Sequence, residues 1–167
     1  SSMCISSTRP AVETAGGAGA GVGAADGVGV GLGFGFEGLS PPQPAAIVAC
    51  GGALGGVLGP GHALYQRLGE RWAERGVEFV RVGYREPNNL DLCAHDLACG
   101  VELARDAGAD RVVVMGHSFG GAVAVRTAVI MPVSVVGVVT FATQSAGCEV
   151  AGALGGRPLL LFHGDRD

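Results

Sequence analysis

The sequence contains no lysine, and all eleven of its basic residues are arginine. A Walker-type phosphate loop, a Schiff-base enzyme and a serine–lysine dyad each need a lysine amine, so these three classes are excluded. Closely paired cysteines are also absent, because the five cysteines are widely spaced and include no CxxC pair. Zinc sites and disulfide frameworks use such pairs or even numbers of cysteines. We therefore expect reduced, mostly buried thiols, with no metal and no cofactor.

Charge and long apolar runs are equally sparse. Charged residues make up 16% of the sequence and the net charge is −4, whereas proteins that bind nucleic acid present a basic surface. The longest apolar run, residues 129–142, is interrupted by Pro132 and Ser134 and is too short to span a bilayer. We expect no nucleic-acid partner, no membrane span and a cytoplasmic location. The serine-rich, acid-free first twelve residues leave an organellar targeting segment as the alternative.

Glycine, in contrast, is abundant, with 31 residues and its densest run before residue 45. Over residues 27–36 glycine alternates with an apolar residue, which costs backbone entropy and leaves one face without side chains. We predict that residues 1–44 form a disordered low-complexity arm, with an ordered edge strand as the alternative. A GxGxxG match that starts at Gly33 precedes prolines and no helix, so we interpret it as a chance match.

From residue 45 onward, short apolar segments alternate with amphipathic ones. One of the amphipathic segments places Leu64, Leu68 and Trp72 on a single stripe of a helix. Alternating strands and helices are typical of an α/β fold with a parallel sheet, and residues 45–167 are predicted to form its core. The strands are expected at residues 45–52, 77–84, 110–116, 134–142 and 157–164, and the helices at 61–76, 90–109 and 120–131.

The strongest chemical signal is Gly116-His117-Ser118-Phe119-Gly120, a G-x-S-x-G motif between a predicted strand and a predicted helix. A serine at such a sharp turn exposes its hydroxyl at the carboxyl edge of the sheet, beside the positive end of the helix dipole. We therefore predict that Ser118 is a nucleophile. The alternative is an ordinary N-cap serine, since serine is a favoured residue at that position.

Residues 45–167 resemble the α/β-hydrolase fold, of the dienelactone-hydrolase-like or small serine-esterase kind. The resemblance is carried by the GHSFGG elbow, the CGGALGG loop after the first core strand and the closing LLLFHGDRD. It implies an incomplete three-layer α/β/α core in which the acid of a catalytic triad follows a late strand as G-x-x-D. That position is Asp167, at the end of the strand next but one to that of Ser118, and Asp165 is the alternative acid.

The same resemblance implies an oxyanion hole made by two backbone N–H groups. Phe119 follows the serine and would supply one, and Gly52 in the loop after the first core strand would supply the other. Cys50, at the start of that loop, is interpreted as buried packing, because nothing near it in sequence would lower the pKa of its thiol.

The resemblance also implies a triad histidine after the acid, and the sequence contains none beyond Asp167. His62, at the start of the first predicted helix, is the alternative base. We expect the catalytic histidine to lie beyond Asp167, so that these 167 residues are truncated before it and are nearly inactive by themselves.

These observations predict a serine hydrolase that cleaves an ester, a thioester or a related acyl bond of a small molecule through an acyl-serine intermediate. The alternative is a non-catalytic α/β-hydrolase-like module that binds a ligand or partner. Gln144, Ser145 and Cys148 follow a strand's carboxyl end and are expected near the site by position alone. The sequence does not indicate the acyl group or the oligomeric state.

Overall fold

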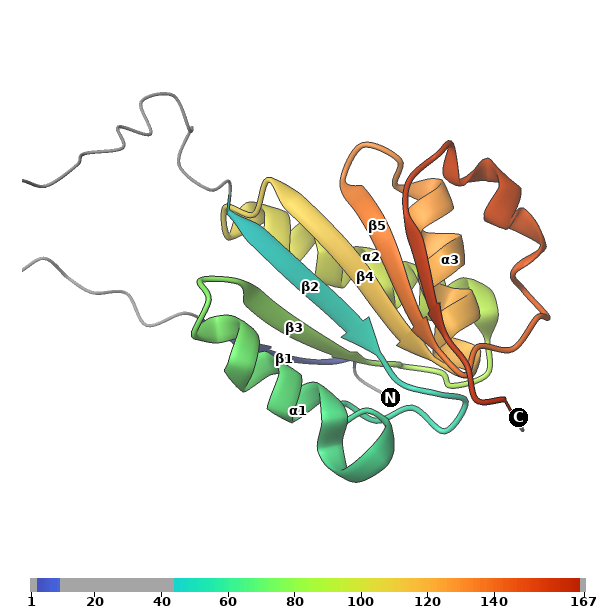
Figure 1. Ribbon diagram of the computed structural model, residues 1–167, viewed down its shortest axis with the longest axis horizontal. Coiled ribbons are helices and arrows are strands. Elements are labelled where there is room, and N and C mark those ends of the chain that lie inside the picture. Colours follow the sequence, from blue (N-terminus) through green and yellow to red (C-terminus); the bar gives the residue numbers. More distant parts are fainter. Residues whose placement is uncertain (1–2, 10–43, 166–167) are drawn as a thin grey trace, which may run out of the picture. The chain divides into compact units, whose positions relative to one another are not determined.

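The computed structural model describes residues 3–9 and 44–165, and Figure 1 shows how their elements are arranged. The strands and helices alternate along the sequence as the apolar and amphipathic segments predict. Their order is β1 (Cys4–Thr8), β2 (Ala45–Cys50), α1 (Pro60–Ala73), β3 (Glu78–Gly83), α2 (Leu90–Asp106), β4 (Arg111–His117), α3 (Phe119–Ile130), β5 (Val135–Phe141), a short 3₁₀ helix (Glu149–Leu154) and β6 (Leu159–Phe162).

The strands of the described part form one sheet with the order β1-β3-β2-β4-β5-β6. Strands β3, β2, β4, β5 and β6 run parallel to one another, and β1 is antiparallel to β3. Parallel neighbours bring their carboxyl ends to one edge of the sheet, where ligand sites of α/β proteins form. The predicted α/β parallel sheet is therefore confirmed, and β6 is next but one to β4, as expected for the closing strand.

Strand β1 is the element that sequence analysis missed. The boundary at residue 44 left all earlier residues outside the core, but Cys4 lies opposite Gly83 and Thr8 opposite Phe79 in a regular antiparallel ladder. Polar side chains support this edge, because Arg81 donates a hydrogen bond to the Ser6 hydroxyl at 2.9 Å. Sequence analysis did not predict β1 because its partner strand, β3, is remote in sequence. The rest of the predicted arm, residues 10–43, lies outside the described residues.

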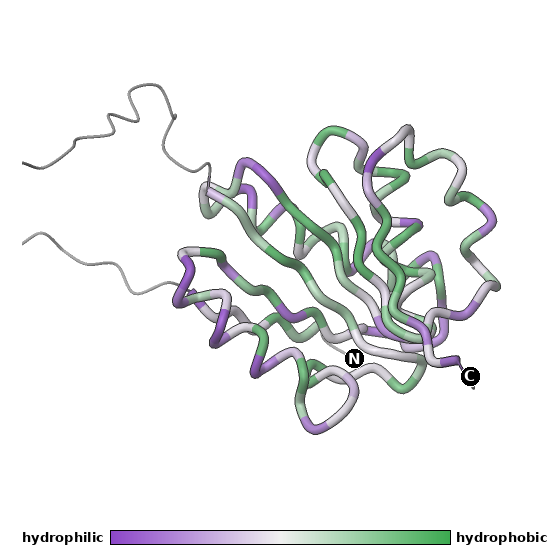
Figure 2. Tube along the Cα trace, viewed as in Figure 1, coloured by the Kyte–Doolittle hydropathy of each residue, from purple (hydrophilic) through white to green (hydrophobic). Residues whose placement is uncertain are grey.

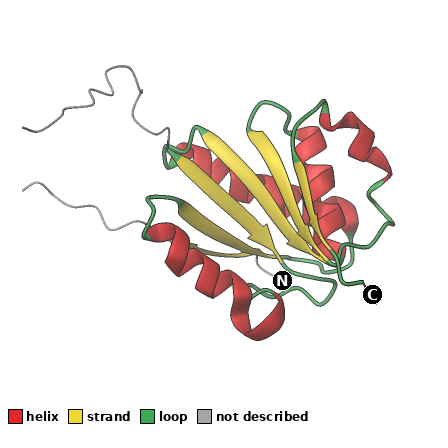
Figure 3. Ribbon diagram, in the orientation of Figure 1, coloured by secondary structure: helices red, strands yellow, loops and turns green. Residues whose placement is uncertain are grey.

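The core has two faces, because successive side chains of a strand point to opposite sides of the sheet. Figure 3 shows α1 on one face and α2 with α3 on the other. In Figure 2 the central strands are hydrophobic along most of their length, as strands covered on both faces should be. The strand residues packed toward α2 and α3 include Ala46, Val48, Cys50, Val80, Val82, Val112 and Val114, and those packed toward α1 include Ile47, Ala49, Phe79 and Met115.

Helix α1 packs through a stripe slightly different from the predicted one. Tyr65 and Gly69 are its buried residues, and the predicted stripe of Leu64, Leu68 and Trp72 flanks them half-buried. A side chain at position 69 would crowd the Thr8 hydroxyl of β1, at 3.1 Å from a Cβ placed there. Because Gly69 has no side chain, the helix can lie close to the sheet edge, and the ring one turn earlier reaches further into the core.

Hydrogen bonds hold the segment that connects β3 to helix α2. The Asn89 side chain accepts a hydrogen bond from the N–H of Leu92 at 3.2 Å, which caps the helix N-terminus. Further along, the buried Asp96 carboxylate accepts from the Arg85 side chain at 2.6 Å and from the Arg85 backbone N–H at 2.9 Å. A buried carboxylate needs such partners, so these bonds fix the connection between β3 and α2.

We predict that Gly100→Ala destabilises the fold. In an exposed helix interior this change usually stabilises by up to about 1 kcal/mol, but a Cβ on Gly100 would lie 2.6 Å from Val82 Cγ2 and 3.0 Å from Val48 Cγ1. Valine side chains are stiff and cannot move aside, so we expect a loss of about 1–3 kcal/mol in thermal or urea unfolding. Gly152→Ala is the control, because nothing lies within 4 Å of a Cβ there. A Gly100→Ala variant as stable as the parent would contradict the packing of α2 on the sheet.

Candidate functional site

Ser118 lies at a sharp turn between β4 and α3, where the G-x-S-x-G motif predicts it. Its backbone has φ 53° and ψ −120°, a strained conformation for a residue with a side chain. The Ser118 N–H donates to the carbonyl of Phe141 at 2.9 Å, and its carbonyl accepts from the N–H of Gly121 at 2.9 Å. Ser118 precedes the first residue of α3, yet its side chain makes no capping hydrogen bond. The hydroxyl therefore does not serve the helix as an ordinary N-cap.

The glycines around Ser118 permit this turn because backbone lies against backbone. A Cβ on Gly116 would collide with the Gly120 carbonyl, and one on Gly120 would collide with the Gly51 carbonyl. A Cβ on Gly121 would overlap the hydroxyl of Thr143, which follows β5. The three glycines of GHSFGG are thus required by close packing, and the turn is wedged between the ends of β2 and β5.

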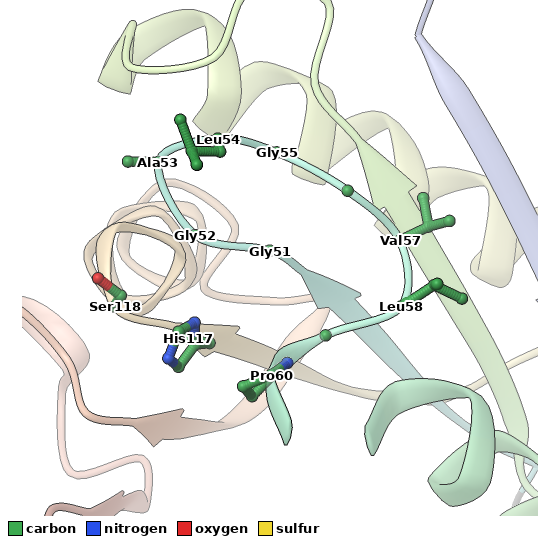
Figure 4. Close-up of a pocket in the computed structure, with 12 residues that line it drawn as sticks. Gly51, Gly52, Ala53, Leu54, Gly55, Val57, Leu58, Pro60, His117 and Ser118 are labelled. Atoms are coloured by element: carbon green, nitrogen blue, oxygen red, sulfur yellow. The ribbon is translucent and has the colours of Figure 1, made fainter. Parts of the chain in front are cut away.

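A pocket of about 390 Å³ opens beside Ser118. One continuous segment, residues 51–60, forms most of its wall and is called the pocket loop below. His117 and Ser118 complete the lining, and Figure 4 shows both beside the Gly51–Gly52 end of the pocket loop. The side chains that the pocket loop contributes are apolar, those of Ala53, Leu54, Val57, Leu58 and Pro60.

Of the two predicted oxyanion-hole residues, Gly52 lines the pocket and Phe119 directly follows the lining residue Ser118. Phe119 is the first residue of α3, so its N–H has no partner within the helix. Gly52 adjoins the elbow, since a Cβ placed on it would lie 3.7 Å from Ser118 Cβ. Within residues 3–9 and 44–165, no hydrogen bond uses the N–H of Phe119 as its donor, so that group is available to a ligand. Gly52 forms an isolated antiparallel bridge with Gly55 inside the pocket loop.

The acid of the predicted triad is only partly within the described residues. Strand β6 runs parallel to β5, and the N–H of Ala142 donates to the Phe162 carbonyl at 2.7 Å beyond the end of the ladder. This brings the end of β6 to the same sheet edge as Ser118. Asp165, the alternative acid, is exposed there. Asp167 lies outside the described residues, so its assignment stays a prediction.

The four histidines fall into distinct surroundings, and in the described part no hydrogen bond joins any of them to the Ser118 hydroxyl. His117 lines the pocket, but Figure 4 shows the serine hydroxyl directed away from its ring. His95 lies 3.4 Å from the Arg85 guanidinium and 3.6 Å from Cys99 Sγ, as measured from Nδ1. His163 is exposed after β6. His62 is exposed and does not line the pocket, so the geometry does not favour it as the base.

The residues expected at the site from position alone contribute through the backbone. The N–H of Gln144 and the hydroxyl of Thr143 each approach the Ser118 carbonyl at 3.5 Å. Ser145 is exposed, and the Cys148 thiol donates to the Gln144 carbonyl at 3.3 Å. None of the three predicted residues lines the pocket in the described part of the protein. Thr143, which sequence analysis did not single out, is the side chain in this segment that touches the elbow.

Cys50 is a packing residue at the end of β2. It is fully buried, and its thiol faces the carbonyls of Met115 at 3.6 Å and Gly120 at 3.4 Å. Burial raises the pKa of the Cys50 thiol to about 12, against a smaller lowering by its hydrogen bond with Tyr84. The thiol is therefore un-ionised near neutral pH, as the sequence interpretation expects of a residue that is not a nucleophile.

In residues 3–9 and 44–165, no group of three histidine, cysteine or acidic side chains could hold a metal ion. No helix of this part is long and apolar enough to cross a bilayer.

Comparison with known proteins identifies the fold family that this architecture resembles. No protein-family model and no curated protein sequence matches the chain. Among solved structures, a dienelactone hydrolase from Anabaena variabilis is similar at 16% identity with a TM-score of 0.62, over 75% of this chain and 64% of that one. An α/β serine hydrolase homologue from Coxiella burnetii is similar at 18% identity with a TM-score of 0.61, over 98% of this chain and 68% of that one.

A putative α/β hydrolase from Agrobacterium tumefaciens is also similar, at 18% identity with a TM-score of 0.59, over 74% of this chain and 60% of that one. The chain thus spans 60–68% of the length of these three structures. Its sheet order, its strand-to-helix elbow and these likenesses agree on one architecture. The chain has the α/β-hydrolase fold, and the predicted three-layer core is confirmed.

We predict that Cys50 resists alkylation in the folded protein. The thiolate is the reactive form, and a buried thiol with a pKa of about 12 supplies very little of it at pH 8. Iodoacetamide followed by peptide mass spectrometry is expected to show Cys4, which is exposed, modified well before Cys50. In denaturant both should react. Equal rates at Cys4 and Cys50 in the folded state would contradict the buried, neutral assignment.

Proposed function

We propose that this protein supplies the nucleophilic serine of a hydrolase that cleaves an ester, thioester or related acyl bond through an acyl-serine intermediate. The observation that carries the proposal is the geometry of Ser118. Its backbone is strained, and its hydroxyl makes no capping hydrogen bond although it precedes a buried helix. Ser118 also lines a pocket. Strain at one residue is retained where the surrounding structure enforces it, as the glycine contacts do here. Hydrolase names among proteins of the same fold agree with this proposal.

The N–H groups of Gly52 and Phe119 would form the oxyanion hole. Attack of Ser118 Oγ on the acyl carbon forms a C–O bond and moves the carbonyl electron pair onto oxygen, which becomes negative. Preorganised N–H donors and the positive end of the α3 dipole stabilise that charge. A general base takes the Ser118 proton during the attack and passes it to the leaving group when the tetrahedral intermediate collapses. Water then attacks the acyl-serine by the same steps, which releases the acid and restores the serine hydroxyl.

The pocket loop would receive the acyl group. Its side chains are apolar, and the one ionisable side chain in the described lining is that of His117. Burial of apolar acyl surface against Ala53, Val57 and Leu58 would contribute about 25 cal/mol per Å² removed from water. A small molecule with an uncharged acyl group is therefore the substrate class that this lining supports.

A general base is the part of the mechanism that the described residues do not supply. Serine attacks efficiently only when a base takes its proton, and such assistance is worth about 10²–10⁴ in rate. We propose that Asp167 orients a histidine supplied from outside the 167 residues, with Asp165 as the alternative acid. The 167 residues by themselves would then keep the oxyanion hole and the pocket without the base.

A second candidate function is a binding module that uses the same fold without chemistry. The observation that favours it is the lack, within the described part, of a histidine hydrogen-bonded to the Ser118 hydroxyl. This candidate leaves the strain at Ser118 without a role, since an ordinary helix start would need no such backbone. Covalent labelling separates the two candidates.

We predict that a fluorophosphonate labels Ser118 selectively, though slowly. Oxyanion stabilisation and binding alone retain about 10³–10⁴ of rate over water when triad residues are removed, which is enough for labelling over long incubations. Mass spectrometry should place the phosphonyl group on Ser118, and Ser118→Ala should abolish it. Ser145→Ala, at an exposed serine nearby, should leave it unchanged. A binding module would show no adduct at Ser118.

We predict that the 167-residue protein hydrolyses p-nitrophenyl acetate close to the background rate. A longer version that carries a histidine after Asp167 should be faster by about 10²–10⁴, the value of general-base assistance. Release of p-nitrophenolate measures the hydrolysis rate of each protein, and the Ser118→Ala variant gives the background rate. Strong turnover by the 167-residue protein that is lost in His62→Ala would refute the proposal and make His62 the base.

A further inference from the structure

We propose that Tyr84, assisted by Tyr65, is the positioning residue that aims the Gly52 N–H at the oxyanion. This inference rests on the proposed function and deepens it. Neither tyrosine lines the pocket, and neither belongs to the G-x-S-x-G motif. Both act through the backbone of the pocket loop.

The pocket loop needs external support, because its own sequence is permissive. Half of residues 51–60 are glycine, and Gly55, Gly56 and Gly59 have positive φ angles. Glycine populates many backbone conformations, so a loop of this composition does not hold one shape by intrinsic preference. Inside the loop, Gly52 and Gly55 form an isolated antiparallel bridge, in which the Gly55 N–H donates to the Gly52 carbonyl at 2.9 Å. Contacts from outside the loop must hold this short bridge in place against the elbow.

Tyr84 fixes that direction through the peptide unit shared by Gly51 and Gly52. Its hydroxyl donates to the Gly51 carbonyl at 2.9 Å. A trans peptide is planar, and the C=O of one residue points opposite to the N–H of the next. Holding the Gly51 carbonyl on one side therefore turns the Gly52 N–H to the other side. The Tyr84 ring also packs edge-to-face against Phe119, with centroids 6.1 Å apart. Tyr84 thus contacts the residues around both proposed donors.

Tyr65 holds the preceding peptide and the far end of the same loop. Its hydroxyl donates to the Cys50 carbonyl at 2.9 Å, and its backbone N–H donates to the Leu58 carbonyl at 3.0 Å. Its ring lies directly beneath Gly59, where a Cβ would come within 2.5 Å of Tyr65 Cγ. One residue therefore joins the two ends of the pocket loop. Between the pocket loop and Tyr65, residues 61–63 have left-handed backbone angles.

The two hydroxyls remain donors at any working pH. Burial raises the pKa of both tyrosines above the ordinary value for a phenol, and the neighbouring Cys50 adds to the effect. A neutral phenol has one O–H, and here each is directed to a backbone carbonyl. These bonds are short, buried and linked to Cys50, whose thiol itself faces the elbow carbonyl of Gly120 at 3.4 Å.

The test compares Tyr84→Phe and Tyr65→Phe with Thr127→Val. Each tyrosine change removes one hydroxyl and keeps the ring. Thr127 is the matched control, because its buried hydroxyl also donates to backbone carbonyls, those of Ala94 and Val123, away from the pocket loop. Labelling of Ser118 by an alkyl fluorophosphonate is measured as a maximal rate and a half-saturating concentration, at a temperature where every variant is folded.

We expect Tyr84→Phe to lower the maximal labelling rate roughly 10- to 100-fold, since a donor displaced by about 1 Å loses much of its effect. The half-saturating concentration should stay within about twofold, because the donors act on the charge of the transition state. Tyr65→Phe should lower the rate in the same sense. Thr127→Val should lower thermal stability and leave the labelling rate unchanged. Equal rates in Tyr84→Phe and the parent would overturn the proposal.

Amide hydrogen exchange gives a second readout that does not depend on catalysis. Both tyrosine variants should exchange faster across residues 51–59, while the Thr127→Val variant should not. If the parent shows no labelling at Ser118, the proposed hydrolase function fails, and exchange still decides whether the hydroxyls hold the loop. Unchanged exchange in Tyr84→Phe and Tyr65→Phe would overturn the positioning role even if Ser118 is labelled normally.

Discussion

The contact between the backbone of Gly120 and the backbone of Gly51 is the constraint on which the site depends. No side chain fits between the start of α3 and the end of β2, because a Cβ on Gly120 would collide with the Gly51 carbonyl. Gly116, at the end of β4, is equally close to the elbow, because a Cβ on it would collide with the Gly120 carbonyl. With the backbones this close, the residue between Gly116 and Gly120 must turn sharply, and Ser118 accepts a positive φ. The strain at Ser118 is therefore a result of how the sheet and helix meet.

The same contact makes the loop after β2 part of the site. The elbow approaches the end of β2 from one side, and the Tyr65 and Tyr84 hydroxyls hold the adjoining carbonyls from the other. Gly52 then lies beside the serine without a side chain of its own. The proposed site is thus built largely from backbone, and in our proposal the surrounding tyrosines act by fixing peptide planes.

The sequence predicted the parts of this arrangement that depend on local pattern. The apolar segment before Ser118 and the glycines around it indicated a strand, a sharp turn and a helix, and the structure has all three. The parallel sheet followed from alternating strands and helices. Strand β1 could not be predicted in this way, because CISST is short and half polar and its partner begins at Glu78. The roles proposed for Tyr65 and Tyr84 were equally hidden, since their hydrogen bonds join residues 15 and 33 positions apart. Ser118, Phe119 and Gly52 lie at one edge of the sheet, but their catalytic roles stay predictions.

The identity of the triad acid is the part of the proposed site that sequence predicts least well. Asp167 lies outside the described residues, and Asp165 is exposed. A triad depends on side chains that converge from remote strands, and sequence order alone cannot supply that convergence.

The antiparallel pairing of β1 with β3 affects how the chain folds. Cys4 pairs with Gly83 and Thr8 with Phe79, so the ladder closes a circuit of more than seventy residues. The entropy cost of closing such a circuit in the unfolded chain grows only with the logarithm of its length, and doubling that length costs about 0.6 kcal/mol. The long sequence separation between β1 and β3 therefore adds little to the entropy cost of their pairing. It affects the rate of folding more, because contacts between residues remote in sequence form slowly.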